Sequence, residues 1–246
     1  VFYFTSLPPP DPEPAAGAKG KAPPPNPSIP PGFTGTIPEE GCLLYMGKDK
    51  FENEILIKNA WPEDVWFHVD KESSAHVYIR LPRGSHKSGD PEWYKRIHPK
   101  VVEDCCQLVK ANSIKGNKLD NISIVFTPAS NLKKTASMET GQVGYHNPNL
   151  IFKAKVETRK NEIVNRLEKT RRWEDTDLEA ELMARMREDK AEAAARAAVE
   201  RAEKEEQEAK WKEEKEAKSY DKLFDATKMT TAGELEVDSD GEVDFM

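Results

Sequence analysis

The sequence predicts an α+β protein: a small mixed or antiparallel sheet with packed helices, followed by a long charged helix and an acidic tail. Three observations predict this class. Short β-prone runs alternate with helical patterns up to about residue 170. The chain then becomes rich in Ala, Glu, Lys and Arg, and it ends in ELEVDSDGEVDFM, which has few apolar residues. We therefore expect a domain over 1–170, a charged helix over 171–218 and a disordered tail over 219–246.

The stretch WPEDVWFHVDKESSAHVYIR, residues 61–80, predicts a β-hairpin with its turn at 71–74. Successive strand side chains point to opposite faces, so the hairpin should have one apolar face and one mixed face. The apolar face carries Val65, Phe67, Val69, Val77 and Ile79. The mixed face carries Trp66, His68, His76, Tyr78 and Arg80. Rings and cations of this kind suit stacking on bases and contact with phosphates, so we expect the mixed face to be open to solvent.

Two strands at the beginning of the chain, 1–5 and 42–46, should pair as a hairpin with an enlarged loop. Twelve of the 18 prolines lie between Leu7 and Gly41. Proline lacks a backbone donor, and this composition offers little apolar area for burial. Residues 8–40 are therefore predicted to be a disordered, proline-rich insertion, with a docking segment as the alternative.

Further elements follow from hydrophobic spacing. Helices are predicted over 51–57, with apolar residues at 51, 55 and 56, and over 99–112, with a buried stripe of Val102, Cys105, Cys106 and Val109. Strands are predicted over 121–127 and 151–156. From Glu157 the pattern is helical to about Lys218, and Val156, Ile163, Val164 and Leu167 should dock its first turns on the domain. The later part lacks a sustained heptad, which favours a single helix; a dimeric coiled coil is the alternative.

Two pairs of lysines lie at element ends. Lys48 and Lys50 are at a strand-to-helix junction, where ammonium groups and backbone donors can face a phosphate. The repeated glycines of a phosphate loop are missing, so two solvated surface lysines are the alternative. Lys133 and Lys134 follow the strand over 121–127, a place where proteins often position ligand contacts.

The net charge of −7 conceals an asymmetry: residues 42–170 carry 21 Lys and Arg against 16 Asp and Glu, and residues 171–246 carry 14 against 24. The basic domain keeps nucleic acid open as a partner. Three cysteines, two of them adjacent, do not form a disulfide framework, so a reducing setting is expected. With no membrane span or signal pattern in the sequence, we expect the protein in the cytosol or nucleus.

Catalysis is not expected. His68 and His76 share a face and Asp64 and Asp70 lie nearby, but the spacing provides no third His or Cys for a metal and no nucleophile motif. We therefore predict no enzyme activity, no cofactor and no metal site.

The order of five motifs, GKDKFENE, the 61–80 stretch, KANSIKG, SIVFTPASNLKKT and GQVGYH, resembles the NFACT-R domain. This domain also occurs in large ribosome quality-control factors and in bacterial fibronectin-binding-like proteins. The resemblance implies an RNA-binding α+β module associated with ribosomes or tRNA. It directs attention to Lys48, Asp64, Trp66, Phe67, His68, His76, Arg80, Lys133 and Lys134, of which Asp64 and Phe67 are expected to be structural.

The function predicted on these grounds is that of a non-enzymatic RNA-binding adaptor of ribosomes, rRNA or tRNA, in translation or ribosome quality control. The predicted nucleic-acid contacts are Lys48, Lys50, Trp66, His68, His76, Tyr78, Arg80, Lys133 and Lys134. One alternative is a scaffold that binds a protein partner through the charged helix. Another, implied by the resemblance, is a receptor-like protein that binds DNA. Ser239, followed by acidic residues, resembles an acidic-directed phosphorylation site.

Overall fold

The computed structural model describes residues 1–9, 29–87 and 89–217, and its class is α+β, as predicted. Contacts divide the chain into two compact units, Val1–Arg185 and Met186–Met246. The helices are α1 (Lys50–Asn59), α2 (Pro99–Ala111), α3 (Asn161–Lys169) and α4 (Leu178–Ala217). The strands are β1 (Phe2–Ser6), β2 (Cys42–Met46), β3 (Asp64–Val69), β4 (Val77–Arg80), β5 (Ile122–Pro128), β6 (Leu132–Lys133), β7 (Gly144–Tyr145), β8 (Phe152–Val156) and β9 (Arg172–Trp173).

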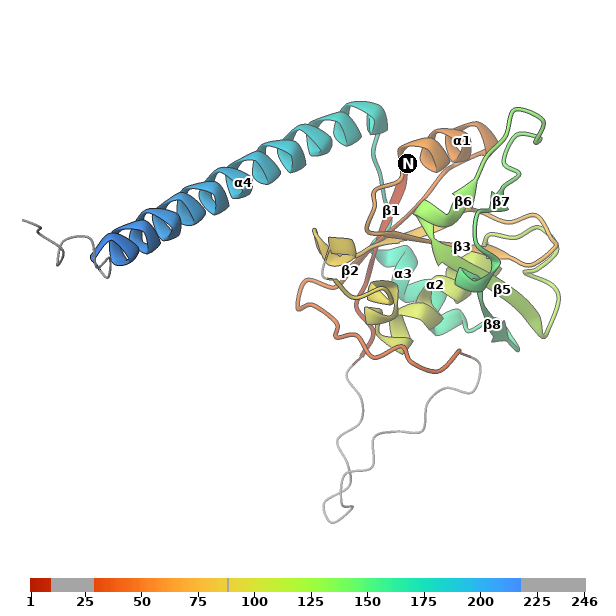
Figure 1. The fold of residues 1–246 in the computed structure, drawn as a ribbon. Coiled ribbons are helices and arrows are strands. Elements are labelled where there is room, and N and C mark those ends of the chain that lie inside the picture. Colours follow the sequence, from red (N-terminus) through yellow and green to blue (C-terminus); the bar gives the residue numbers. More distant parts are fainter. Residues whose placement is uncertain (10–28, 88, 218–246) are drawn as a thin grey trace, which may run out of the picture. The chain divides into compact units, whose positions relative to one another are not determined.

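Seven strands form an antiparallel sheet in the order β8-β5-β3-β4-β2-β1-β9. A separate two-stranded ribbon pairs β6 with β7 (Figure 1). The predicted hairpin is confirmed as β3 and β4, in which Val65 lies opposite Ile79 and Phe67 opposite Val77. The predicted pairing of the first two strands is also confirmed, as β1 with β2. The hairpin therefore lies in the middle of the sheet, where β5 flanks it on one side and β2 on the other.

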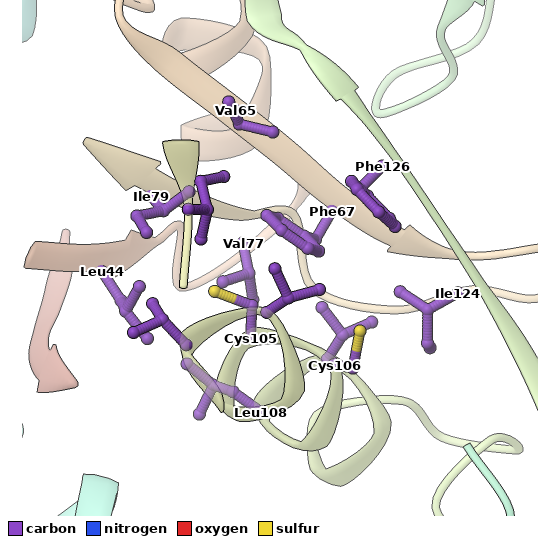
Figure 2. Packing of buried hydrophobic residues seen from close by; sticks show 14 of the residues in the cluster. Leu44, Val65, Phe67, Val77, Ile79, Cys105, Cys106, Leu108, Ile124 and Phe126 are labelled. Carbon is purple, nitrogen blue, oxygen red and sulfur yellow. The ribbon is translucent and has the colours of Figure 1, made fainter. Parts of the chain in front are cut away.

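The apolar face of the sheet packs on α2, as Figure 2 shows for Phe67 and Val77 above the two cysteines of that helix. Cys105 is 0% exposed and Cys106 is 2% exposed. Pro99 begins α2, where its missing N–H has no helical partner to lose. The predicted stripe of α2 and the predicted apolar face of the hairpin are both confirmed.

All three cysteines are free thiols. Burial raises the pKa of Cys105, of Cys106 and of half-buried Cys42. The thiols are therefore protonated at neutral pH, and Cys105 and Cys106 serve as small apolar core residues.

The last part of the predicted insertion, residues 29–40, is ordered against the sheet. Phe33 is 6% exposed, and its ring makes edge-to-face contacts with Phe126 and Phe152 at centroid distances of 5.4 and 5.8 Å. Ile29 and Ile37 also contact this core. The prediction of disorder is wrong here because a single aromatic ring in a proline-rich stretch finds an apolar site on β5 and β8. Residues 10–28 lie outside the described part of the chain.

The single helix predicted from Glu157 to Lys218 is interrupted. Its first part, α3, ends at Lys169, and β9 follows in antiparallel pairing with β1 before α4 begins. Thr170 stops the helix, since its hydroxyl donates to the Leu167 carbonyl at 2.7 Å and accepts from the Thr5 amide at 3.0 Å. Val156 belongs to β8, which confirms the strand predicted over 151–156, and it is not part of the first helical turns. The prediction missed this break because a two-residue strand has too few side chains to show a period.

The docking stripe itself is present. Val164 is 3% and Leu167 is 0% exposed, and both face the domain. The compact unit also continues past residue 170, because Leu178 is 6% exposed and Arg185 is 5% exposed at the start of α4. Arg185 Nη2 lies 2.7 Å from Oε1 of the fully buried Glu63. The first two turns of α4 thus belong to the folded domain.

In the second unit, every residue of α4 from 191 to 217 is exposed. An ion pair with i,i+4 spacing joins Lys210 and Glu206 at 2.6 Å, which supports the helix locally. The predicted tail over 219–246, with Ser239, lies outside the described residues.

The helix predicted over 51–57 is confirmed as α1, but its buried face differs from the prediction. Phe51 is 65% exposed and Ile55 is 48% exposed, whereas Leu56 is 1% exposed and Asn53 is 7% exposed. The helix therefore packs through Leu56 and Asn53.

Candidate nucleic-acid interface

The mixed face of the hairpin, predicted to be open to solvent, is covered. Trp66 is 1%, His76 is 2% and Tyr78 is 0% exposed. Trp66 and Tyr78 form a second core with Leu56 of α1 and Leu132 of β6. The prediction of exposure is wrong because amphipathic rings also suit a second buried layer once their polar atoms find partners. Trp66 and Tyr78 cannot stack on a base in this conformation.

Arg80, predicted to contact phosphate, is engaged inside the domain. Its Nε lies 2.9 Å from Asp64 Oδ1 and its Nη2 lies 3.1 Å from Asp64 Oδ2, which is a bidentate pair. The guanidinium also lies over the Trp61 ring at 3.7 Å. Asp64 accepts a further hydrogen bond from the Tyr45 hydroxyl at 2.5 Å. Asp64 thus has the structural place expected for it, and Arg80 has little capacity left for a ligand.

Two histidines lie beside Trp66 with defined tautomers. Trp66 Nε1 donates to His76 Nδ1 at 2.9 Å, so the proton of neutral His76 is assigned to Nε2. His68 stacks on Trp66 with a centroid distance of 5.4 Å, and its Nδ1 lies 2.7 Å from the Val69 carbonyl oxygen. That contact assigns the His68 proton to Nδ1 and leaves Nε2 as an acceptor.

Both imidazoles are neutral at pH 7. Burial lowers the pKa of His68 below 6.5. Burial, with a smaller contribution from the neighbouring His68, lowers the pKa of His76 to about 3. Because neither ring carries charge, neither can attract a phosphate as a cation; they can contribute hydrogen bonds and ring surface.

His68 and His76 line a cleft with a volume of about 640 Å³, which we call the β2–α1 cleft. The cleft brings together segments that are far apart in the sequence: Phe2, 46–50, Asn53, His68, 73–76, Asn112, Ile114, 140–141 and Arg171. Lys48 and Lys50 lie on its wall, so four of the predicted contact residues meet here. Trp66, Tyr78, Arg80, Lys133 and Lys134 are not among the residues that line it.

Lys48 and Lys50 are exposed, and within the described ranges neither ammonium group has a carboxylate partner. Three backbone amides around them already donate to carboxylates of the protein. Asp49 accepts from the amides of Phe51 and Glu52, both at 2.9 Å, and the Lys48 amide donates to Glu52 Oε2 at 2.7 Å. This junction therefore provides two side-chain cations and no phosphate loop.

The second lysine pair is divided between two roles. Lys133 is exposed on β6. Lys134 Nζ donates to Glu54 Oε1 at 2.5 Å and to the carbonyl oxygens of Glu139 and Gln142 at 2.6 and 2.9 Å. All three donors of Lys134 are used, so it holds the 134–142 loop against α1. The structure gives Lys134 a positioning role in place of the predicted phosphate contact.

Two further findings concern the described residues. They contain no group of three or more His, Cys, Asp or Glu side chains placed to hold a metal ion. No described helix has the length and hydropathy needed to cross a bilayer.

Comparisons with known proteins show the family to which this chain belongs. Residues 33–147 match the family model described as the NFACT protein RNA binding domain. Coiled-coil domain-containing protein 25 of Bos taurus is 49% identical over 197 residues, which are 80% of this chain and 91% of that protein. Its counterpart in Danio rerio is 52% identical over 158 residues, which are 64% of this chain and 73% of that protein.

This chain belongs to the coiled-coil domain-containing protein 25 family. The NFACT-R resemblance seen in the sequence is confirmed. Among solved structures, the C-terminal part of the fibronectin/fibrinogen-binding protein from Streptococcus suis aligns at 21% identity and a TM-score of 0.40, over 52% of this chain and 46% of that one.

The family match contains most of the cleft, including residues that the sequence analysis missed. Asn53 and Ile114 lie within 33–147, in the motifs GKDKFENE and KANSIKG, which could have indicated them. Arg171 lies outside the match and was assigned to a continuous helix, so no sequence signal separated it from its neighbours. Its guanidinium pairs with Glu168 at 2.9 Å and lies over the Phe2 ring at 5.5 Å.

Proposed function

We propose that this chain is a non-enzymatic RNA-binding adaptor, associated with ribosomes or tRNA, that binds RNA at the β2–α1 cleft. The observation that carries the proposal is that the residues matching an RNA binding domain family, 33–147, include the unpaired cations of this cleft, Lys48 and Lys50. Arg171 adds a third cation from outside the match. Cations near a cleft provide the phosphate contacts on which RNA affinity depends.

The salt dependence of binding tests the proposal. In Lys48→Gln/Lys50→Gln, affinity for single-stranded RNA should fall, and the slope of log K against log salt should become shallower by about 1.4, or about 0.7 for each lost phosphate contact. Both lysines are exposed, so the fold should be preserved. Fluorescence anisotropy across a salt series measures both quantities.

The matched control is Lys204→Gln/Lys212→Gln, which removes the same charge from exposed positions on α4. An equal loss in both double variants would indicate a diffuse charge effect and would contradict binding at the cleft. The RNA should also be recovered intact after incubation. Cleavage products formed by the purified protein would contradict a binding-only role.

The exposed part of α4 supports a second candidate, a scaffold that binds a protein partner. A helix of 40 residues is about 60 Å long, and from 191 onward every described residue of it is exposed. Removing residues 188–246 keeps Arg185 and the whole first unit. Co-sedimentation with ribosomes that survives this truncation supports the cleft, and complete loss supports the helix.

A further inference from the structure

The walls of the β2–α1 cleft carry hydrogen-bond acceptors as well as cations. We propose that the cleft binds one unpaired ribonucleotide, with Lys48 and Lys50 on its phosphate, with His68 accepting a hydrogen bond from its 2′-hydroxyl, and with Asn53 accepting one from an N–H group of its base. This inference rests on the proposed function, and it adds a prediction that RNA binding alone does not make: the cleft distinguishes ribose from deoxyribose.

Asn53 provides the first observation. The residue is 7% exposed, lines the cleft, and its Oδ1 is buried without a hydrogen-bond partner. A buried acceptor without a donor is unfavourable, and a donor supplied by a ligand removes that penalty. Gly47 leaves room for the amide, because a Cβ at that position would lie 2.3 Å from Asn53 Oδ1. The glycine of the GKDK motif thus has a steric reason to be there.

His68 provides the second acceptor. Its Nδ1–H is directed to the Val69 carbonyl oxygen at 2.7 Å, so its Nε2 carries a lone pair. Stacking on Trp66, at an interplanar angle of 7°, fixes the orientation of the ring. Since burial lowers the pKa of His68, the ring remains an acceptor at neutral pH.

Ile114, on another wall of the cleft, can contact an unstacked base. Ile114 lines the cleft and is 83% exposed, and hydrogen bonds fix the loop that carries it. Ser113 Oγ donates to the Ser73 carbonyl at 2.6 Å, and buried Lys110 donates to the carbonyl of Gly116 at 2.9 Å. A rigidly presented aliphatic side chain of this kind offers a surface to one face of a base. The cleft volume of about 640 Å³ is within the range of roughly 300–1,000 Å³ typical of small-ligand sites.

These contacts define the chemistry of the ligand. It must offer a negative charge to Lys48 and Lys50 and hydrogen-bond donors to His68 and Asn53. The phosphate, the 2′-hydroxyl and a base N–H group of RNA together meet these requirements, and DNA lacks the hydroxyl. Paired bases in a duplex cannot enter a cleft of this size without leaving the helix, so the ligand is an unpaired nucleotide.

The test compares three fluorescent ten-nucleotide single strands of one mixed sequence: RNA, DNA and 2′-O-methyl RNA. With the 246-residue chain, RNA should bind about tenfold more tightly than DNA, because His68 would accept a hydrogen bond from the 2′-hydroxyl that DNA lacks. The 2′-O-methyl strand, which cannot donate, should bind like DNA. Equal affinity for RNA and 2′-O-methyl RNA would overturn the inference while leaving RNA binding intact, whereas the absence of RNA binding would overturn the proposed function itself.

A pair of variants assigns the effect to His68. His68→Phe keeps a ring over Trp66 and removes the acceptor, so the RNA-to-DNA affinity ratio should fall from about 10 to about 1. His68→Gln retains an acceptor and should retain part of the ratio. Thermal denaturation of both variants verifies that they are folded. An unchanged ratio in folded His68→Phe would contradict the role of His68.

Discussion

The two faces of the central sheet are both buried, but they are held in different ways. The face toward α2 is closed by apolar side chains, among them Phe67 and Val77. The face toward α1 is closed by aromatic rings, several of which use their polar atoms in hydrogen bonds, as Trp66 does with His76. The first face has few polar atoms to satisfy, whereas the second has several, and most of them are paired. The β2–α1 cleft lies beside the second face, and His68 and His76 of that face line it.

Truncating one large ring on each face gives the strongest test of this comparison. Phe67→Ala and Trp66→Ala should each lower the free energy of unfolding by about 3–5 kcal/mol, because both rings are at most 1% exposed. Lys133→Ala, at an exposed position, should change it by no more than about 0.5 kcal/mol. Urea denaturation measures all three. A Trp66→Ala variant as stable as the parent would mean that the second face is open after all.

The beginning of α4 contributes to the cover of the second face. Arg185→Ala leaves the buried Glu63 carboxylate without its guanidinium partner and should cost about 3 kcal/mol of unfolding free energy. The amide of Gly84 donates to Glu63 at 2.7 Å and limits the loss. Arg187→Ala, two residues further along the helix and exposed, is the matched control. Equal stability of the two variants would show that Arg185 does not fasten α4 to the domain.

Acid should weaken the second face through His76. Folded His76 has its pKa lowered to about 3, whereas the unfolded chain binds this proton near pH 6.5. The unfolded state therefore holds more protons between these values, and stability should fall as pH drops from 6.5 toward 3, by up to about 1.4 kcal/mol for each pH unit. His76→Gln should flatten this dependence, whereas His146→Gln, at an exposed position, should not. Urea denaturation at pH 7.5, 6.0 and 5.0 measures this dependence. The prediction is contradicted if the unfolding free energies of the parent and of His76→Gln fall by the same amount as the pH drops.

The smallest effect is expected within a stacked pair, Tyr45 and Tyr78, whose rings lie 4.9 Å apart. The Tyr78 hydroxyl is buried without a hydrogen-bond partner, so Tyr78→Phe should leave stability unchanged or raise it by up to about 1 kcal/mol. Tyr45→Phe removes the bond to Asp64 and should cost about 1–3 kcal/mol. The opposite ranking in thermal denaturation would mean that the Tyr78 hydroxyl has a partner.

Much of the fold could be predicted because its pattern is local. Phe67 and Val77 alternate with polar neighbours, and Val102 to Val109 follow a helical spacing, so their partners need not be known. Trp66 and Tyr78 show why the second face could not be predicted: their rings suit either solvent or a second layer. The layer that covers them comes from α1 and from residues 129–145, and no local pattern indicates that these segments fold back.

The site was predicted in part for the same reason. Lys48 and Lys50 were found because a strand-to-helix junction is visible in the sequence, and they line the cleft. Lys134 has the same charge and a similar place after a strand, but its partner Glu54 lies 80 residues earlier. Whether a lysine meets a ligand or a carboxylate depends on tertiary contacts of this kind, which spacing does not reveal.

The pairing of β9 with β1 has a consequence for the order in which the domain can be completed. Tyr3 lies opposite Arg172, so Tyr3 must wait for a partner that is synthesised about 170 residues later. At 5–20 residues per second, this delay is roughly 10–30 s. During that interval the outer edge of β1 has unpaired amides and carbonyls, and nascent chains should be most prone to misassociation then.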